Sequence, residues 1–172
     1  MTLERRAFAA ELRAKGRTLI GYAATFGVTA SIGDFTEMIA AGAFRYTLAA
    51  GKDVLALVDH DTSRLLARTR SKTLRLSEDS RGLQFDLDLP NTSAANDVLA
   101  LEERGDLGGM SFAFLPIDER WDGDHRELRS VDLKEISVVS AWPAYPQTQV
   151  SARSRLVLFP RAAVARRYLE TI

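Results

Sequence analysis

The sequence predicts a mainly β protein of the α+β class, built as an antiparallel β-barrel surrounded by a few helices. Three observations carry this prediction. Short segments of alternating polar and apolar residues recur along the chain, turn residues separate them, and only two or three segments favour a helix. With 172 residues, of which 46% are hydrophobic, the chain is long enough to bury one core. We therefore expect seven or more short strands.

The first third of the chain predicts one clear strand and one short helix. Residues 1–17 mix charges with alanines, so they form either a frayed lead-in or a polar first strand. Residues 18–26 alternate large and small side chains, as a strand with one large-residue face does. Residues 27–34 are loop-like, and a short helix is expected at 44–50.

The middle of the chain contains the strongest hairpin pattern. Residues 54–61 form an apolar segment that suits a strand. Residues 74–76 and 83–89 alternate apolar with polar side chains on either side of a turn. This pattern predicts two antiparallel strands that expose one face to water.

A helix is expected over residues 94–104. Either Asn91 or Thr92 can cap its first turn, because both side chains accept hydrogen bonds from free backbone amides. Gly105 is the expected stop, since glycine readily adopts the left-handed conformation that ends a helix.

The last strands are expected on both sides of a turn. Residues 108–117 are predicted to form a strand, and residues 118–125 contain Asp-Gly-Asp, which favours a turn. Residues 127–132 would return from that turn, and residues 133–141 form a β-branched, apolar run that suits a buried strand. Prolines from residue 143 onward would break it.

Charge divides the chain into a body and a tail. Residues 151–172 contain five arginines and one glutamate, a net charge of +4, so residues 1–150 carry a net charge of −4. We expect the basic tail to be either a flexible extension or a helix packed on the body. No apolar run approaches the roughly 20 residues that span a bilayer, and the N-terminus lacks a secretory signal, so we expect a cytoplasmic protein.

Ser111 is the candidate nucleophile. The chain contains no cysteine, which excludes disulfides, thiolate metal ligands and cysteine nucleophiles, so serine or a carboxylate must carry any covalent chemistry. A glycine pair delivers Ser111 into an apolar run. A serine in a strand is more often just a small packed residue, so the assignment depends on a base that can take its proton.

The chain offers two histidines as bases, His60 and His125. If residues 54–61 form one strand, His60 lies at the end of its buried face, whereas His125 belongs to a polar turn. Asp59 and Asp61 flank His60, but neighbours in a strand point to opposite faces, so neither can easily orient its ring.

Glu135 is the candidate orienting carboxylate. It precedes the apolar run 136–139, where burial without a partner would be costly. A ring nitrogen of His60 would be a suitable partner, but Arg64 or Arg68 would serve equally well. The residue pattern alone leaves these alternatives open.

Several segments together resemble the capsid maturation (prohead) serine proteases of tailed bacteriophages. The resemblance covers about residues 18–151, in the family's order, and Ala113 departs from it because many relatives have glycine there. The segments that carry it are 37–44, 60–61, 65–69, 108–114, 133–139 and 143–145.

The resemblance implies a fold similar to that of the herpesvirus assemblins, which are serine proteases built on a β-barrel ringed by helices. It implies that Ser111 is the nucleophile, that His60 is the general base and that Glu135 is the third, orienting member. His125 precedes that third position and is discounted. No metal or organic cofactor is implied, and backbone amides of residues 141–145 are the expected oxyanion donors.

The implied function is that of a serine endopeptidase of capsid maturation, acting within the assembling prohead in the host bacterial cytoplasm. Its expected partners are the scaffolding protein and the major capsid protein, with the protease itself as a further substrate. Assemblin relatives are often activated as homodimers. The alternatives are a catalytically inactive assembly protein of the same fold and a nucleic-acid-binding protein, which the acidic body disfavours.

Overall fold

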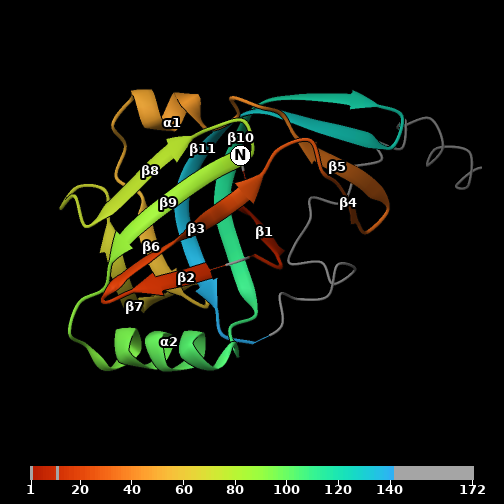
Figure 1. Cartoon of the computed structure of the whole chain (residues 1–172). Coiled ribbons are helices and arrows are strands. Elements are labelled where there is room, and N and C mark those ends of the chain that lie inside the picture. The colour runs from red at the N-terminus through yellow and green to blue at the C-terminus, as the bar shows by residue number, and fades with distance from the viewer. Residues whose placement is uncertain (1, 11, 142–172) are drawn as a thin grey trace, which may run out of the picture.

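The computed structural model describes residues 2–10 and 12–141. These residues form two sheets, with one helix at each end of the body (Figure 1). The helices are α1 (Arg45–Ala49) and α2 (Ser93–Arg104). The strands are β1 (Glu4–Phe8), β2 (Leu12–Lys15), β3 (Thr18–Thr25), β4 (Thr29–Ile32), β5 (Phe35–Ile39), β6 (Leu55–Val58), β7 (Asp61–Arg68), β8 (Leu74–Glu78), β9 (Gly82–Asp88), β10 (Gly109–Asp122) and β11 (His125–Val139).

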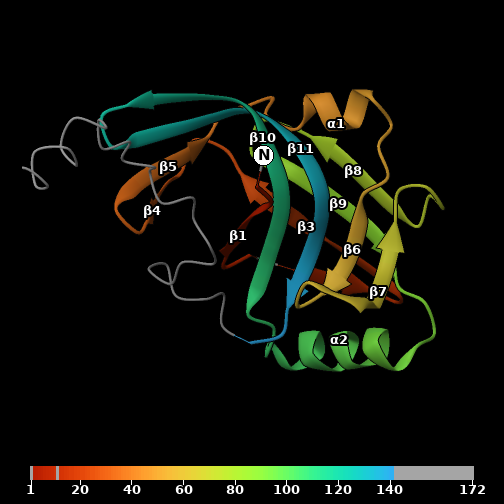
Figure 2. The ribbon, with the colours of Figure 1, turned by 180° about the vertical axis from the view of Figure 1, so that it is seen from behind.

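The larger sheet has seven strands and is organised around β11. Its strand order is β1-β10-β11-β5-β4, and β6 joins it by pairing with both β11 and β7. β10 and β11 form a long antiparallel hairpin with register shifts between residues 113 and 119. β11 runs parallel to β5 along residues 125–128 and parallel to β6 along residues 135–138 (Figure 2). The first half of β11 therefore pairs with β5 and the second half pairs with β6, so the sheet branches at this strand.

The second sheet has four strands in the order β2-β3-β9-β8 and packs on the first. The predicted hairpin at 74–89 is confirmed, since β8 and β9 pair antiparallel with Leu76 opposite Phe85. Both sheets contribute to one core. Its fully buried members include Leu19 and Phe85 from the smaller sheet and Phe112 and Ile136 from the larger one.

The mainly β class is confirmed, but the barrel is not. No closed barrel is found among the described residues, which instead form two sheets that share a core. The larger sheet is also mixed, because β11 makes parallel pairings with strands that precede it by many residues. Alternation within single segments cannot predict such distant pairings.

The predicted helix at 94–104 is confirmed together with its caps. The Thr92 hydroxyl accepts a hydrogen bond from the Ala95 amide at 3.4 Å, so Thr92 rather than Asn91 is the N-cap. Gly105 has a φ of 71° and ends the helix in the left-handed conformation. Ala95 and Val98 are buried against the body.

The structure decides between the two alternatives for residues 1–17. They contain two strands, β1 and β2, rather than a frayed lead-in, and β1 carries buried charges. The predicted loop at 27–34 contains β4. The turn predicted at Asp-Gly-Asp within residues 118–125 is confirmed, and the flanking strands β10 and β11 pair right up to it, as far as Asp122 and His125. This hairpin and the β4–β5 pair extend from the body as an arm (Figure 1).

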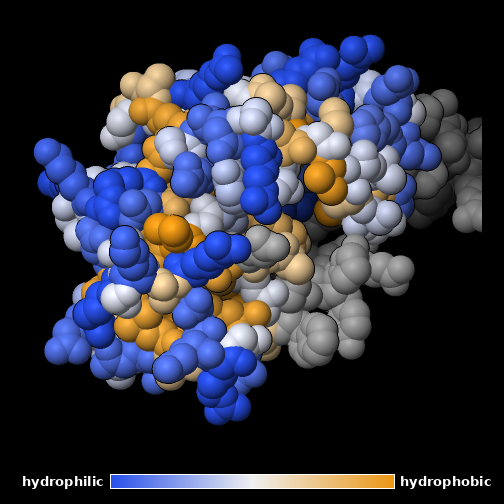
Figure 3. Space-filling view, viewed as in Figure 1, coloured by the Kyte–Doolittle hydropathy of each residue, from blue (hydrophilic) through white to orange (hydrophobic). Residues whose placement is uncertain are grey.

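The outward face of the smaller sheet is largely hydrophilic, with hydrophobic atoms gathered where β2 approaches α2 (Figure 3). An exposed cluster in which Arg75 contacts Asp86 and Asp88 belongs to the polar part. Neither helix in the described part of the chain has the length and apolar composition needed to cross a bilayer.

Candidate active site

Ser111 lies on β10 and points away from the core. Met110, Phe112 and Phe114 alternate into the hydrophobic core, so Ser111 and Ala113 belong to the opposite face of the sheet. Gly109 has a φ of 139°, and a Cβ there would lie 2.3 Å from the Phe8 carbonyl oxygen. Gly109, two residues before Ser111, therefore allows β1 to approach β10 closely.

Strand register brings Glu135 to the face that carries Ser111. Ser111 is opposite Ser137 on β11, and Ala113 is opposite Glu135. Directly paired residues of an antiparallel ladder share a face, so Ser111, Ser137 and Glu135 lie on the same side of the sheet. All three are buried, with exposed fractions of 1%, 0% and 7%.

His60 occupies the tip of the hairpin between β6 and β7. Val58 pairs directly with Asp61, which leaves Asp59 and His60 as a two-residue turn with φ values of 51° and 61°. The expectation that His60 continues the buried face of a strand over 54–61 is wrong, because β6 ends at Val58. The left-handed turn instead brings the His60 ring to the non-core face of β11.

His60 and Glu135 are brought together directly. Nδ1 of His60 and Oε1 of Glu135 are hydrogen-bonded, and the histidine side chain is 18% exposed. Nε of Arg5 lies 3.8 Å from the same carboxylate oxygen. Among the described residues this Nε has no hydrogen-bond partner, although it is buried. The carboxylate therefore has a histidine and an arginine beside it.

The two arginines that the sequence left as alternatives bind elsewhere. Arg64 donates to the Asp59 carboxylate at 3.2 Å, and Arg68 pairs with the Asp53 carboxylate. Both contacts lie at the protein surface. The partner of Glu135 that the structure favours is the imidazole.

Ser111 is close to this pair but is not hydrogen-bonded to it. The Ser111 hydroxyl donates to the carbonyl oxygen of Arg6 on β1 at 2.8 Å. The backbone amide of His60 donates to the hydroxyl oxygen of Ser137 at 3.2 Å, and Ser137 is the residue paired with Ser111. His60, in the turn between β6 and β7, and Ser111, on β10, thus both adjoin Ser137.

His125 lies apart from the candidate site. It begins β11, ten residues before Glu135, and its Nδ1 is 3.0 Å from the Thr36 hydroxyl oxygen at the arm. Within the described residues no group of three or more His, Asp or Glu side chains is arranged to hold a metal ion.

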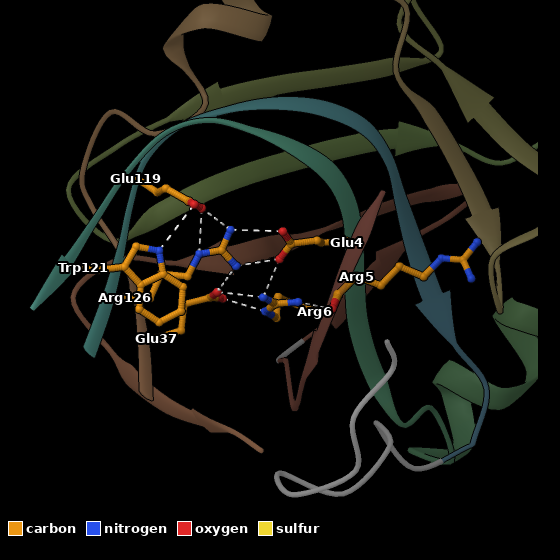
Figure 4. Close-up of polar contacts among 7 residues, drawn as sticks. All are labelled: Glu4, Arg5, Arg6, Glu37, Glu119, Trp121 and Arg126. Atoms are coloured by element: carbon orange, nitrogen blue, oxygen red, sulfur yellow. Dashed lines mark hydrogen bonds and ion pairs between the residues drawn. The ribbon is translucent and has the colours of Figure 1, made fainter. Parts of the chain in front are cut away.

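A charged cluster that the sequence did not predict lies under β1, on the opposite, core-facing side of the sheet. Arg6 contacts Glu37 through two hydrogen bonds of 2.6 and 2.7 Å and contacts Glu4 at 2.8 Å. Arg126 contacts Glu4 at 2.6 Å, Glu37 at 2.9 Å and Glu119 at 2.9 Å. These five residues form the charged cluster drawn in Figure 4, where Arg5 points away from it.

The charges in this cluster stabilise one another. Burial by itself would raise the pKa of Glu4, but the Arg126 hydrogen bond and the charges of Arg126 and Arg6 hold that pKa below its usual value. The pKa of Arg126 is raised, since hydrogen bonds to Glu4 and Glu119 outweigh the effect of burial. The spacing of Glu4 and Arg6 on one face of a strand was the sequence signal for this cluster, but only the partners from β5 and β11 make it recognisable.

β10 carries a serine, and the neighbouring strand β11 carries a carboxylate that is hydrogen-bonded to a histidine. These are the residue types of a serine hydrolase site. The comparison with protein families agrees with that class. The model described as caudovirus prohead serine protease matches residues 3–158, and the chain belongs to this family. No curated protein and no solved structure matches the chain. The resemblance to the prohead proteases is therefore confirmed, whereas the likeness to the herpesvirus assemblins stays a prediction.

Proposed function

We propose that this protein is the serine endopeptidase of phage capsid maturation, with Ser111 as nucleophile, His60 as general base and Glu135 as the orienting carboxylate. The observation that carries the proposal is the hydrogen bond between His60 Nδ1 and Glu135, made on the face of the sheet that bears Ser111. Membership of the prohead serine protease family supports the reaction class.

Glu135 has a defined part in this proposal. In the proposed tautomer, Nδ1–H of His60 donates a hydrogen bond to the carboxylate, and the unprotonated Nε2 is able to act as a base. Among the described residues Nε2 has no hydrogen-bond partner, so it is available for the serine hydroxyl. The carboxylate also stabilises the imidazolium that forms when the proton is transferred.

The reaction begins when the Ser111 hydroxyl exchanges the Arg6 carbonyl for Nε2 of His60. The serine oxygen then attacks the scissile carbonyl carbon while Nε2 takes the hydroxyl proton. The imidazolium returns that proton to the leaving amine as the peptide C–N bond breaks. Water, activated by the same imidazole, hydrolyses the acyl-enzyme and regenerates Ser111.

Backbone amides of residues 141–145 are the proposed oxyanion donors, because this segment follows the strand that carries Glu135. Of these residues only Ala141 belongs to the described part of the chain. The proposed reaction requires no metal ion or organic cofactor.

The proposed substrates are the scaffolding protein, the scaffold-like segment of the major capsid protein and the protease itself, all within the assembling prohead. The basic segment 151–172 lies outside the described residues; we propose that it either tethers the enzyme to the assembly or is removed by self-cleavage. An intact C-terminus in active enzyme, measured by mass spectrometry, would argue against self-cleavage. Gel filtration of the active enzyme tests for a homodimer.

The decisive experiment mixes purified wild type and Ser111→Ala with the cognate scaffolding and capsid proteins and follows fragments by gel and mass spectrometry. We expect cleavage by wild type and none by the variant. Ser77→Ala is a matched control, since Ser77 is an exposed strand serine on β8, in the other sheet. Equal cleavage by Ser111→Ala would overturn the assignment. Absence of cleavage by wild type as well would favour an inactive assembly protein.

A further inference from the structure

The turn that carries His60 is unusual for a two-residue hairpin. Such turns have positive φ at both central residues, and for this reason they strongly prefer Asn-Gly or Asp-Gly. Here the second position is His60, with φ 61°, where glycine would be less strained. A side chain kept in this conformation needs contacts elsewhere that hold it.

Those contacts come from the end of β11 and from Ser140, the residue that follows it. The Asp59 amide donates to the Val138 carbonyl at 2.9 Å, and the His60 amide donates to the Ser137 hydroxyl oxygen at 3.2 Å. The Asp59 carboxylate accepts from the Ser140 amide at 2.8 Å and from the Ser140 hydroxyl. The turn is therefore fixed to β11 by two backbone amides and to Ser140, directly after β11, by one carboxylate.

Ser137 differs from its neighbours in the run 136–139. Ile136 and Val138 are buried in the core, whereas Ser137 is a fully buried hydroxyl on the opposite face, next to Ser111. An apolar residue at this position would leave the partly buried His60 amide without its acceptor, which destabilises the turn. The hydroxyl thus has a specific partner in the turn.

We propose that Ser137 and Asp59 are positioning residues that clamp the Asp59–His60 turn onto β11 and so keep the imidazole of His60 on Glu135. The side chain of Ser137 binds the backbone amide of His60, and the carboxylate of Asp59 binds Ser140, so both hold the backbone from which the imidazole projects. The kinetic part of this inference rests on the proposed protease function, but the structural part does not.

The spectroscopic test uses the fact that the chain has two histidines. In wild type we expect the Nδ1 proton of His60, bonded to Glu135, to give an imidazole resonance protected from exchange with water, which a His125→Gln variant would identify by elimination. We expect Ser137→Ala to broaden or abolish this resonance while the fold is retained. An unchanged resonance would overturn the role of Ser137.

The test of Asp59 uses glycine. Asp59→Gly removes the carboxylate at a position with φ 51°, which glycine adopts without strain, so the turn itself is not disfavoured. We expect the imidazole resonance to weaken although thermal stability is kept. Asp59→Asn retains an oxygen acceptor for the Ser140 amide and tolerates the same conformation, so it should restore the resonance. Asp61→Ala is the matched control, because the Asp61 carboxylate contacts Ser63 on its own strand, β7, and not β11 or Ser140.

The kinetic test measures kcat and KM separately on a scaffold-derived peptide. Misplacing a catalytic group by about 1 Å can cost about 100-fold in rate, so we expect Ser137→Ala and Asp59→Gly to lower kcat by roughly 10- to 100-fold with KM little changed. A rise in KM at constant kcat would overturn the positioning role. If wild type does not cleave but the resonance responds as described, the clamp stands and the protease function fails.

Discussion

The two faces of β1, β10 and β11 carry ionisable groups in contrasting arrangements. On the core-facing side, the arginines of the charged cluster contact glutamates from β1, β5 and β10. On the other side, Nε2 of His60 and Nε of Arg5 have no hydrogen-bond partner among the described residues. The first arrangement uses its hydrogen-bonding capacity in holding strands together, whereas the second leaves two side-chain nitrogens without a hydrogen bond, as the proposed site requires.

The two arrangements suit two different roles within a single sheet. Buried charges are tolerated when each has close, well-oriented partners, and such a set holds its strands in one register. A reactive group must instead keep one atom unengaged. Arg6 contacts both groups. Its side chain lies in the charged cluster, and its carbonyl oxygen accepts a hydrogen bond from the Ser111 hydroxyl.

The largest expected effect follows from replacing Glu135, on the face of the sheet that carries His60. Glu135→Gln keeps the shape of the side chain but can present an amide N–H to Nδ1, which selects the wrong histidine tautomer. In a comparable triad such a change lowers kcat about 10,000-fold, and we expect a loss of this order. Activity within tenfold of wild type would show that another group orients His60.

The next effect concerns the charged cluster. Arg126→Met leaves Glu4, Glu37 and Glu119 with one arginine fewer, and breaking a buried pair costs about 3–5 kcal/mol. Urea unfolding measures the change in the free energy of unfolding. Arg75→Met is the matched control: Arg75 contacts two exposed aspartates, and exposed pairs contribute about 0–1 kcal/mol. Equal losses in the two variants would mean that the cluster has no special role.

A smaller effect appears on acidification. The folded-state pKa of Glu4 is lower than its usual value of 4.5, so Glu4 stabilises the fold above that pH and loses this contribution as the pH falls below it. The stability difference between wild type and Glu4→Gln should therefore be full at pH 7 and shrink below about pH 4.5. Unfolding titrations at several pH values test this, and a difference independent of pH would contradict it.

The smallest effect is expected at Arg5. Its contact with Glu135 is 3.8 Å long and its side chain is 37% exposed, so solvent weakens the interaction. We expect Arg5→Gln to change kcat/KM by less than about tenfold, which corresponds to about 1.4 kcal/mol, and to reduce its dependence on salt. A loss as large as that of Glu135→Gln would place Arg5 among the catalytic residues.

Local patterns predicted the elements whose structure depends on local interactions. The β8–β9 hairpin follows from alternation on either side of a turn, and α2 follows from Thr92 and Gly105 at its ends. Glu135 was recognisable because a carboxylate beside an apolar run needs a partner, although the sequence could not choose between His60 and an arginine.

The remaining features depend on pairings between distant segments. Alternation wrongly extended β6 through His60, because it carries no signal for a left-handed turn held by Ser137 and Asp59. The charges of β1 left open whether residues 1–17 form a frayed lead-in or a polar strand, since the partners that bury these charges come from β5 and β11.

The hydrogen bond from Ser111 to the Arg6 carbonyl joins residues 105 positions apart in the chain. β1 is therefore synthesised well before β10, and it can pair with β10 only after the intervening segments have been made. Contacts of such high sequence separation form late and slowly in folding. The sheet that carries the candidate site is thus completed only once β10 and β11 have been synthesised, so a growing chain that has not reached them has no assembled site.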